Sequence, residues 1–236
     1  MKANRTVAVS GGLLMLASAA LAGTLSTSTA NASPSSTTNT ANASTASTAN
    51  AGTDNARRGG NHTHTHLRAL NNSGVAGRAE VHVKHRRLKI SVDAHGLTRG
   101  QPHAQHIHFG AQARHECPTT ADNTNRDFRL TTTEGAPAYG PIQVSLTTRG
   151  DTSPASALDV TRFPTTPKGV ENYDRKTRTS LKVARAIKNG KAVVVVHGVD
   201  YNNNGKYDFD GAGASELDPK LPAEATDPAV CGVLKR

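Results

Sequence analysis

Aromatic residues are scarce in this chain of 236 residues, which has no Trp, four Tyr and four Phe. So few aromatic rings leave few platforms for stacking bases, and no nucleic-acid motif is present, so we expect no nucleic-acid partner. The chain has only two cysteines, which excludes a disulfide-dense scaffold and a four-cysteine zinc site. Beyond the N-terminus no apolar run approaches the roughly 18 residues of a membrane helix, so no span is expected in the mature protein.

The N-terminus has the pattern of a secretory signal peptide. A short basic start precedes an apolar run over residues 7–22, which ends in small residues. Cleavage after Ala22 or Ala32 fits the A-x-A pattern. We therefore predict a signal peptide within residues 1–32 and a secreted, extracellular or cell-envelope protein. A membrane anchor of marginal length is the alternative.

Residues 33–60 are mostly Ser, Thr, Ala, Asn and Gly. Such a segment buries too little apolar surface to offset its ordering entropy, so we predict a disordered spacer. The remaining residues, 61–236, are enough for one core. The net charge of +10 lies mostly in this part. In an exported protein it favours anionic cell-wall polymers or anionic small molecules as partners; solubility alone is the alternative.

Hydrophobic periodicity in the region after residue 60 indicates strands. Period-two alternation or β-branched runs predict five of them: residues 75–85, 88–94, 103–109, 142–147 and 191–197. One short helix is expected over 181–188, where Asn-Gly follows as a stop signal. Residues 148–180 are rich in Thr, Pro, Gly and charge and are expected to form long loops. Many short strands with Gly and Pro turns indicate an all-β sandwich or barrel.

The histidines carry the clearest chemical signal. His106 and His108 are two residues apart on a predicted strand, so they point to one face while Ile107 points to the other. Two imidazoles on one strand face are a common half of a copper or zinc site. His197, at the end of the valine run, is a candidate third ligand if its strand lies next to the first. Polar residues at a strand edge are the alternative.

The two cysteines, Cys117 and Cys231, are predicted to form a disulfide, because paired cysteines are the simplest arrangement in an exported chain. The closed loop exceeds a hundred residues, so the chain-entropy model gives about 4–5 kcal/mol of stabilisation, less any strain. The bridge would tie the loop after the histidine strand to the C-terminal segment.

Four short motifs in order resemble copper–zinc superoxide dismutase: H-x-x-H-x-H-F-G, a loop cysteine, V-V-V-H and a terminal C-G-V-L. They also resemble the related bacterial CHRD (chordin-type) domains, which have an Ala-x-His-Ile-His-x-Gly stretch after a Gly-Leu loop, here at residues 95–97. The resemblance covers about residues 67–120 and 190–236. It implies a Greek-key β-sandwich or flattened barrel. It also places copper ligands and the disulfide at His106, His108, His197, Cys117 and Cys231.

The chain departs from the dismutase pattern at the remaining site residues. No histidine lies within residues 116–196, so the bridging and zinc ligands are missing, and a dismutase-type zinc site is not expected. Pro228 stands where the active-site arginine would precede the last cysteine. The copper-only dismutases that the chain also resembles hold copper with four histidines. The candidates for a fourth copper ligand in this chain are His103 and His115.

The segment after the valine strand resembles the start of a calcium loop. Oxygen-bearing side chains at positions one, three and five, followed by glycine, fit the sharp turn around Ca²⁺. The glutamate at position twelve is absent. The candidate calcium ligands are Asp200, Asn202, Asn204 and Asp208, and a solvated turn is the alternative.

Alternating histidines at His62, His64 and His66 form a second cluster near the start of the folded region. Such an arm can present several imidazoles to one ion. It would capture copper or zinc, or supply a ligand to the main site. A polar segment leading into the first strand is the alternative.

Three functional hypotheses follow. The first is an exported CHRD-like protein that binds a copper-type metal ion through the His-x-His strand, without established catalysis. The second is a divergent copper-only superoxide dismutase, and therefore an enzyme. The third is a structural cell-surface interaction domain with incidental histidines. We favour the first, because the missing arginine weakens the guidance and binding of an anionic substrate.

Overall fold

The computed structural model describes residues 61–236, so the predicted signal peptide and spacer lie outside the described residues. Eight antiparallel strands form one sheet in the order β5-β4-β7-β8-β1-β2-β3-β6. Their bounds are β1 His62–Ala69, β2 Ala76–Lys84, β3 Arg87–His95, β4 Gln105–His108, β5 Ile142–Ser145, β6 Val170–Arg178, β7 Val193–His197 and β8 Pro228–Val233. The predicted all-β class is confirmed.

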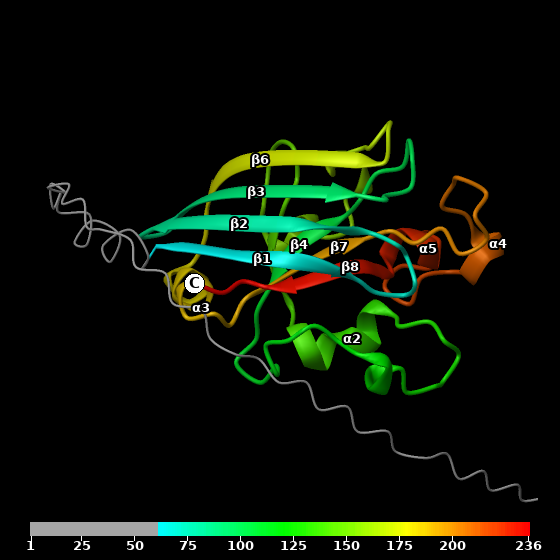
Figure 1. The fold of residues 1–236 in the computed structure, drawn as a ribbon, viewed down its shortest axis with the longest axis horizontal. Helices are drawn as coiled ribbons and strands as arrows, with labels where there is room; N and C mark the ends of the chain where they lie inside the picture. The colour runs from blue at the N-terminus through cyan, green and yellow to red at the C-terminus, as the bar shows by residue number, and fades with distance from the viewer. Residues whose placement is uncertain (1–60) are drawn as a thin grey trace, which may run out of the picture. The chain divides into compact units, whose positions relative to one another are not determined.

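The sheet curls into a flattened half-barrel (Figure 1). Strands β1, β2, β3 and β6 run side by side, and β4, β7 and β8 cross behind them. Side chains bridge the seam between the two edge strands. The Tyr173 hydroxyl of β6 donates to the carbonyl of Thr147, just after β5, at 3.1 Å, and the hydroxyls of Thr152 and Thr177 lie 2.7 Å apart. These contacts cover edges that would otherwise be open to pairing with another chain.

Apolar side chains from both halves of the curl meet inside it. Val81 and Ile90 come from one half, Ile107 and Val194 from the other, and all four are fully buried in one cluster. Because strand residues alternate between faces, the neighbours of Ile107 and Val194 point outward. That outer face of β4, β7 and β8 has its own small cluster, which includes Tyr139. The histidines of β4 lie on this outer face.

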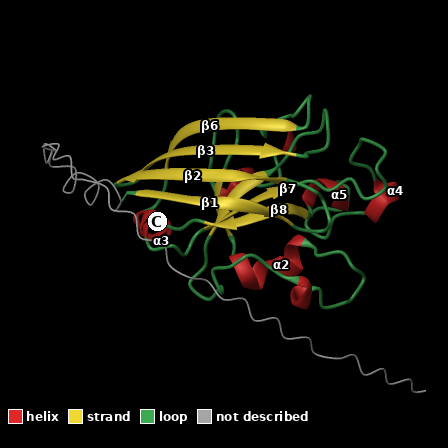
Figure 2. Cartoon of the chain, viewed as in Figure 1, coloured by secondary structure: helices red, strands yellow, loops and turns green. Residues whose placement is uncertain are grey.

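Helices are few and short (Figure 2). They are α2 Thr132–Tyr139, α3 Leu181–Lys188, α4 Phe209–Ala212 and α5 Ala223–Thr226, with 3-10 turns at Thr120–Asp122, Pro154–Ser156 and Val160–Arg162. The helix predicted over 181–188 is confirmed as α3, capped by the Ser180 side chain on the Val183 amide. Within residues 61–236 no helix is both long and apolar enough to cross a bilayer.

The prediction of long loops over residues 148–180 is wrong for its last part. Strand β6 lies there and pairs with β3 from Val170 to Arg178. Within β6 only Glu171 and Tyr173 are buried, and most other positions are polar or charged, so the alternation has little apolar signal. Strands β1 and β8 also lie in segments where no strand is predicted.

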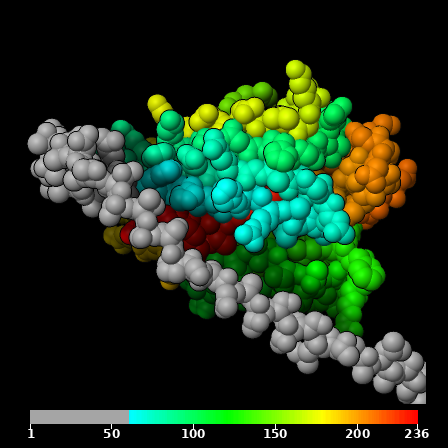
Figure 3. Space-filling model, viewed as in Figure 1, coloured from blue at the N-terminus to red at the C-terminus, as the bar shows by residue number. Residues whose placement is uncertain are grey.

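The predicted disulfide between Cys117 and Cys231 is present, with Cα atoms 5.7 Å apart. Cys231 is buried in β8. Cys117 lies in the loop that covers the outer face of the sheet, where the His115 amide donates to the carbonyl of Ala138 in α2 at 2.9 Å. The bridge therefore fixes this covering loop to a central strand. In the space-filling view, atoms of β1 to β3 form much of the face turned to the viewer (Figure 3).

Candidate metal centre

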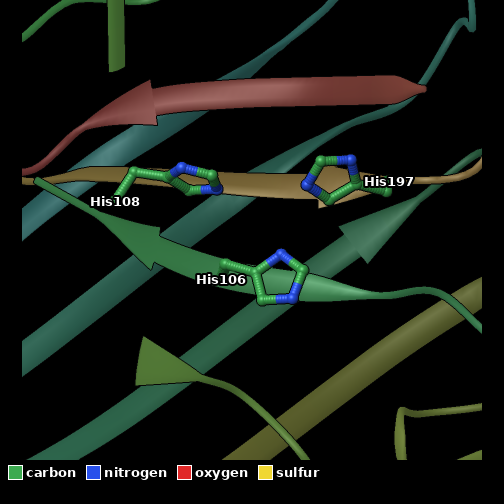
Figure 4. A group of neighbouring side chains, drawn as sticks. All are labelled: His106, His108 and His197. Carbon is green, nitrogen blue, oxygen red and sulfur yellow. The ribbon is translucent and has the colours of Figure 1, made fainter. Parts of the chain in front are cut away.

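Two neighbouring strands bring the three predicted ligands together. Strand β4 pairs with β7 so that His106 lies opposite Val195 and His108 opposite Val193. His197 ends β7, where the pairing with β8 shifts register between Val196 and His197. The rings gather between β4 and β7 (Figure 4), with centroids 5.1 to 6.2 Å apart. One nitrogen from each ring lies within 4.8 Å of the other two.

Backbone carbonyl oxygens fix the protonation of all three rings. One ring nitrogen in each lies near such an oxygen: His106 Nε2 at 3.1 Å from Ala157, His108 Nδ1 at 2.8 Å from Gly140, and His197 Nδ1 at 2.6 Å from Thr226. A carbonyl oxygen only accepts, so that nitrogen carries the proton. Within residues 61–236 the other nitrogens have no hydrogen-bond partner and are buried: His106 Nδ1, His108 Nε2 and His197 Nε2. Each is a lone pair available to a cation.

Burial keeps the three imidazoles neutral. Desolvation lowers the pKa of His108 to about 3 and that of His197 to about 4. It also holds the pKa of His106 well below its usual value, and the neighbouring His197 and His108 lower it further. Neutral imidazole is the form that binds metal. The cluster is therefore in its ligand form near neutral pH.

Aromatic rings and covering segments keep the cluster away from water. The three histidines are only 1–2% exposed. Tyr139 at the end of α2 packs on His108, with centroids 4.5 Å apart, and Phe163 packs edge-on against His106 at 5.3 Å. The Tyr139 hydroxyl donates to the carbonyl of Thr132 within the same helix, so this side chain is held in place. Burial of this kind strengthens interactions with a bound charge.

The two candidates for a fourth ligand lie outside this group. His103 Nδ1 is 3.1 Å from the carbonyl oxygen of His197, and its Nε2 is 3.1 Å from that of Thr98. The Tyr207 hydroxyl also lies 3.1 Å from Nδ1, so Nδ1 can accept from it while Nε2 donates to the Thr98 carbonyl. His115 is half-buried and packs against Phe109, with centroids 5.4 Å apart. Among the described residues the compact group therefore holds three histidines.

The N-terminal histidines His62, His64 and His66 lie on β1, and their side chains point to its outward face. The compact group here combines His62 with Glu80 and His82 of β2. The sequence reasoning missed both β2 residues, because only the strand register brings them beside His62. The backbone carbonyls that orient the buried rings were also missed, and no side-chain pattern marks them.

The predicted calcium loop is folded around its own hydrogen bonds. Asp200 accepts from the backbone amides of Asn204 at 3.1 Å and Gly205 at 2.7 Å. The side-chain amides of Asn202 and Asn204 donate to Asp208, at 3.4 and 2.7 Å. The four candidate ligands are thus close together, and calcium binding there stays a prediction.

Basic side chains gather at one end of β2, β3 and β6. Arg87 lies directly opposite both Lys84 and Arg178, and Lys89 lies opposite Lys176. Like charges that face each other across a ladder are destabilising, and these five residues line a groove of about 870 Å³. An anionic polymer in the groove would offset that repulsion. Attraction to anionic cell-wall polymers stays a prediction, and this groove is where we expect it.

A buried acid, Glu171 of β6, lies beside Gln105 of β4, the strand that carries His106 and His108. The Gln105 side-chain amide donates to Glu171 Oε1 at 2.7 Å, while Glu171 Oε2 and Gln105 Oε1 have no partner. Desolvation raises the pKa of Glu171 to about 8. The carboxyl is therefore protonated at neutral pH.

The protonated state of Glu171 predicts a pH effect on stability. In the unfolded chain the group ionises near its usual pKa of about 4.3, whereas in the folded protein it keeps its proton up to about pH 8. Between these values the Glu171 carboxyl binds fewer protons in the unfolded state, so its contribution to the free energy of unfolding falls as pH rises, by at most about 1.4 kcal/mol per pH unit. We expect Glu171→Gln to remove this contribution. Urea titrations of both proteins at pH 5 and pH 8 test it, and equal slopes would contradict it.

Chemically, three neutral imidazoles facing one point are a donor set for copper or zinc. No protein-family model and no curated protein sequence matches this chain. The chemistry of the centre is therefore argued from its geometry. That geometry supplies three buried imidazole ligands whose rings are oriented by backbone carbonyls.

Proposed function

We propose that this chain is an exported, CHRD-like protein that binds a copper-type metal ion through His106, His108 and His197. One observation carries the proposal: each buried ring has one nitrogen bonded to a carbonyl and another without a partner. Buried polar atoms in proteins are normally paired. Three unpaired lone pairs in one place support a cation as their common partner.

The residues around the rings support binding in a fixed geometry. Metal-bound histidines usually donate their second N–H to a carbonyl or carboxylate, which fixes ring orientation and raises ligand basicity. The carbonyls of Ala157, Gly140 and Thr226 have this role here. Copper, when bound, supplies one-electron chemistry. The protein itself holds the rings neutral and excludes water.

Burial favours metal binding over turnover of a small anion. The ligands are 1–2% exposed, so an anionic substrate would have to cross the covering segments. Pro228, where a dismutase would carry its guiding arginine, is a buried residue of β8. Both observations support a binding role without established catalysis. A copper-only dismutase remains the second candidate, supported by the three convergent histidines and the disulfide.

Copper titration of the chelator-treated, oxidised protein tests the proposal. We expect one tightly bound copper ion per chain and imidazole-nitrogen coupling in the Cu(II) electron paramagnetic resonance spectrum. Superoxide should disappear no faster than it does in buffer without protein. Tight copper with fast turnover would instead support the dismutase. An absence of tight copper would overturn the metal centre and leave the structural surface domain.

A further inference from the structure

The second cluster of metal-ligating side chains lies on the outward face of β1 and β2. The strand register places His62 directly opposite His82, and His64 directly opposite Glu80. Side chains of opposite residues in an antiparallel pair are close neighbours. The His62 and His82 rings stack with centroids 4.2 Å apart and planes 10° from parallel. One ligand atom from each of His62, Glu80 and His82 lies within 4.8 Å of the other two.

One ligand atom of the cluster lacks a hydrogen bond. Among residues 61–236, His62 Nε2 has no hydrogen-bond partner, and Glu80 Oε2 lies 3.6 Å from it, at ion-pair distance. The side chains of His62 and Glu80 are each 36% exposed, so an ion can reach them directly from solvent. This access distinguishes the cluster from the buried three-histidine centre, from which β8 separates it in the sheet.

The donor atoms of this cluster suit a divalent ion. Glu80 adds a carboxylate, so part of the ion's double charge is neutralised by the site itself. Two imidazoles and one carboxylate, with water in the open positions, are a donor set that zinc uses in proteins.

We propose that His62, Glu80 and His82 form a second, surface-exposed site for a divalent transition-metal ion of the zinc type. The β1–β2 register forms this site, and the proposal does not require the buried centre to bind copper. A bound ion would link the start of β1 to the end of β2. Its release and uptake would be faster than at the buried centre, because water reaches its ligands.

Zinc titration in a His108→Gln background isolates the surface site, because that substitution removes a ligand of the buried centre. We expect this variant to bind one zinc ion in competition with a chromophoric chelator. Adding His82→Asn or Glu80→Gln should weaken zinc binding by more than about 10-fold, since even the loss of an outer hydrogen-bond partner weakens metal binding by 10–100-fold. Zinc binding that is unchanged by both substitutions would overturn the proposal.

His85→Asn is the matched control. His85 lies in the turn just after β2, outside the cluster, with φ of +57°, a conformation that asparagine adopts readily. The same chemical change there should leave zinc affinity unaltered; an equal loss at positions 82 and 85 would also overturn the site. In the unaltered chain, histidine-ring NMR signals give a second readout. Zinc should shift those of His62 and His82, and a shift confined to the buried rings would exclude the surface site.

Discussion

A His108→Gln variant is expected to bind copper more than about 100-fold more weakly than the unaltered protein. Glutamine is similar in size to histidine, and its amide can still donate to the carbonyl of Gly140, the partner of His108 Nδ1 at 2.8 Å. It cannot present the unpartnered imidazole nitrogen. Because loss of an outer hydrogen-bond partner alone costs 10–100-fold in metal affinity, loss of one of three ligands costs more. Competition with a chromophoric copper chelator measures the effect.

The same substitution at His115 provides the control for the buried centre. His115 lies outside the three-histidine group, so His115→Gln should keep the copper affinity of the unaltered protein. Circular dichroism and urea titration establish that both variants are folded. Equal weakening in the two variants would mean that the centre is not formed by the three rings, or that His115 is a ligand after all.

Loss of the disulfide has the second large expected effect. A Cys117→Ala/Cys231→Ala variant should lose about 4–5 kcal/mol of unfolding free energy, because the bridge joins residues 114 apart in sequence and its absence frees a long loop in the unfolded chain. Part of the loss comes from the buried β8 position, where alanine leaves a small void. Urea titrations of the disulfide-bonded protein and of the double-alanine variant measure the difference.

Adding a reductant distinguishes the loss of the disulfide from other effects of the two alanine substitutions on stability. It should destabilise the unaltered protein by a similar amount and leave the double-alanine variant unchanged, since that variant has no thiol to reduce. A difference below about 1 kcal/mol in both comparisons would contradict the chain-entropy argument for this loop.

The strands that the sequence predicts best are those with a strong apolar face. Residues 88–94 alternate so regularly that β3 is found almost whole, and the valine run of β7 is unmistakable. Strand β6 is missed because Glu171 is one of its two buried residues. An acidic residue in this position favours a loop prediction, because the sequence does not show that Gln105 donates to Glu171 in the folded protein. Its burial is a tertiary effect that local pattern does not contain.

For the candidate site, the sequence predicts the ligands better than their surroundings. The His-x-His spacing puts His106 and His108 on one face by strand geometry alone. That His197 reaches the same place depends on β4 pairing with β7, which local periodicity does not specify. The surface cluster depends on the fold even more, because only the β1–β2 register brings Glu80 and His82 next to His62. Contacts that depend on register require the fold.

The position of β8 has a consequence for how the protein is made. It is the last strand in chain order, yet it lies between β7 and β1 in the middle of the sheet. While the ribosome still holds residues 228–233, the earlier strands can form only two separate ladders, β5-β4-β7 and β1-β2-β3-β6. The two ladders therefore join into one sheet only after β8 has been made, so the core shared by both halves of the curl forms late.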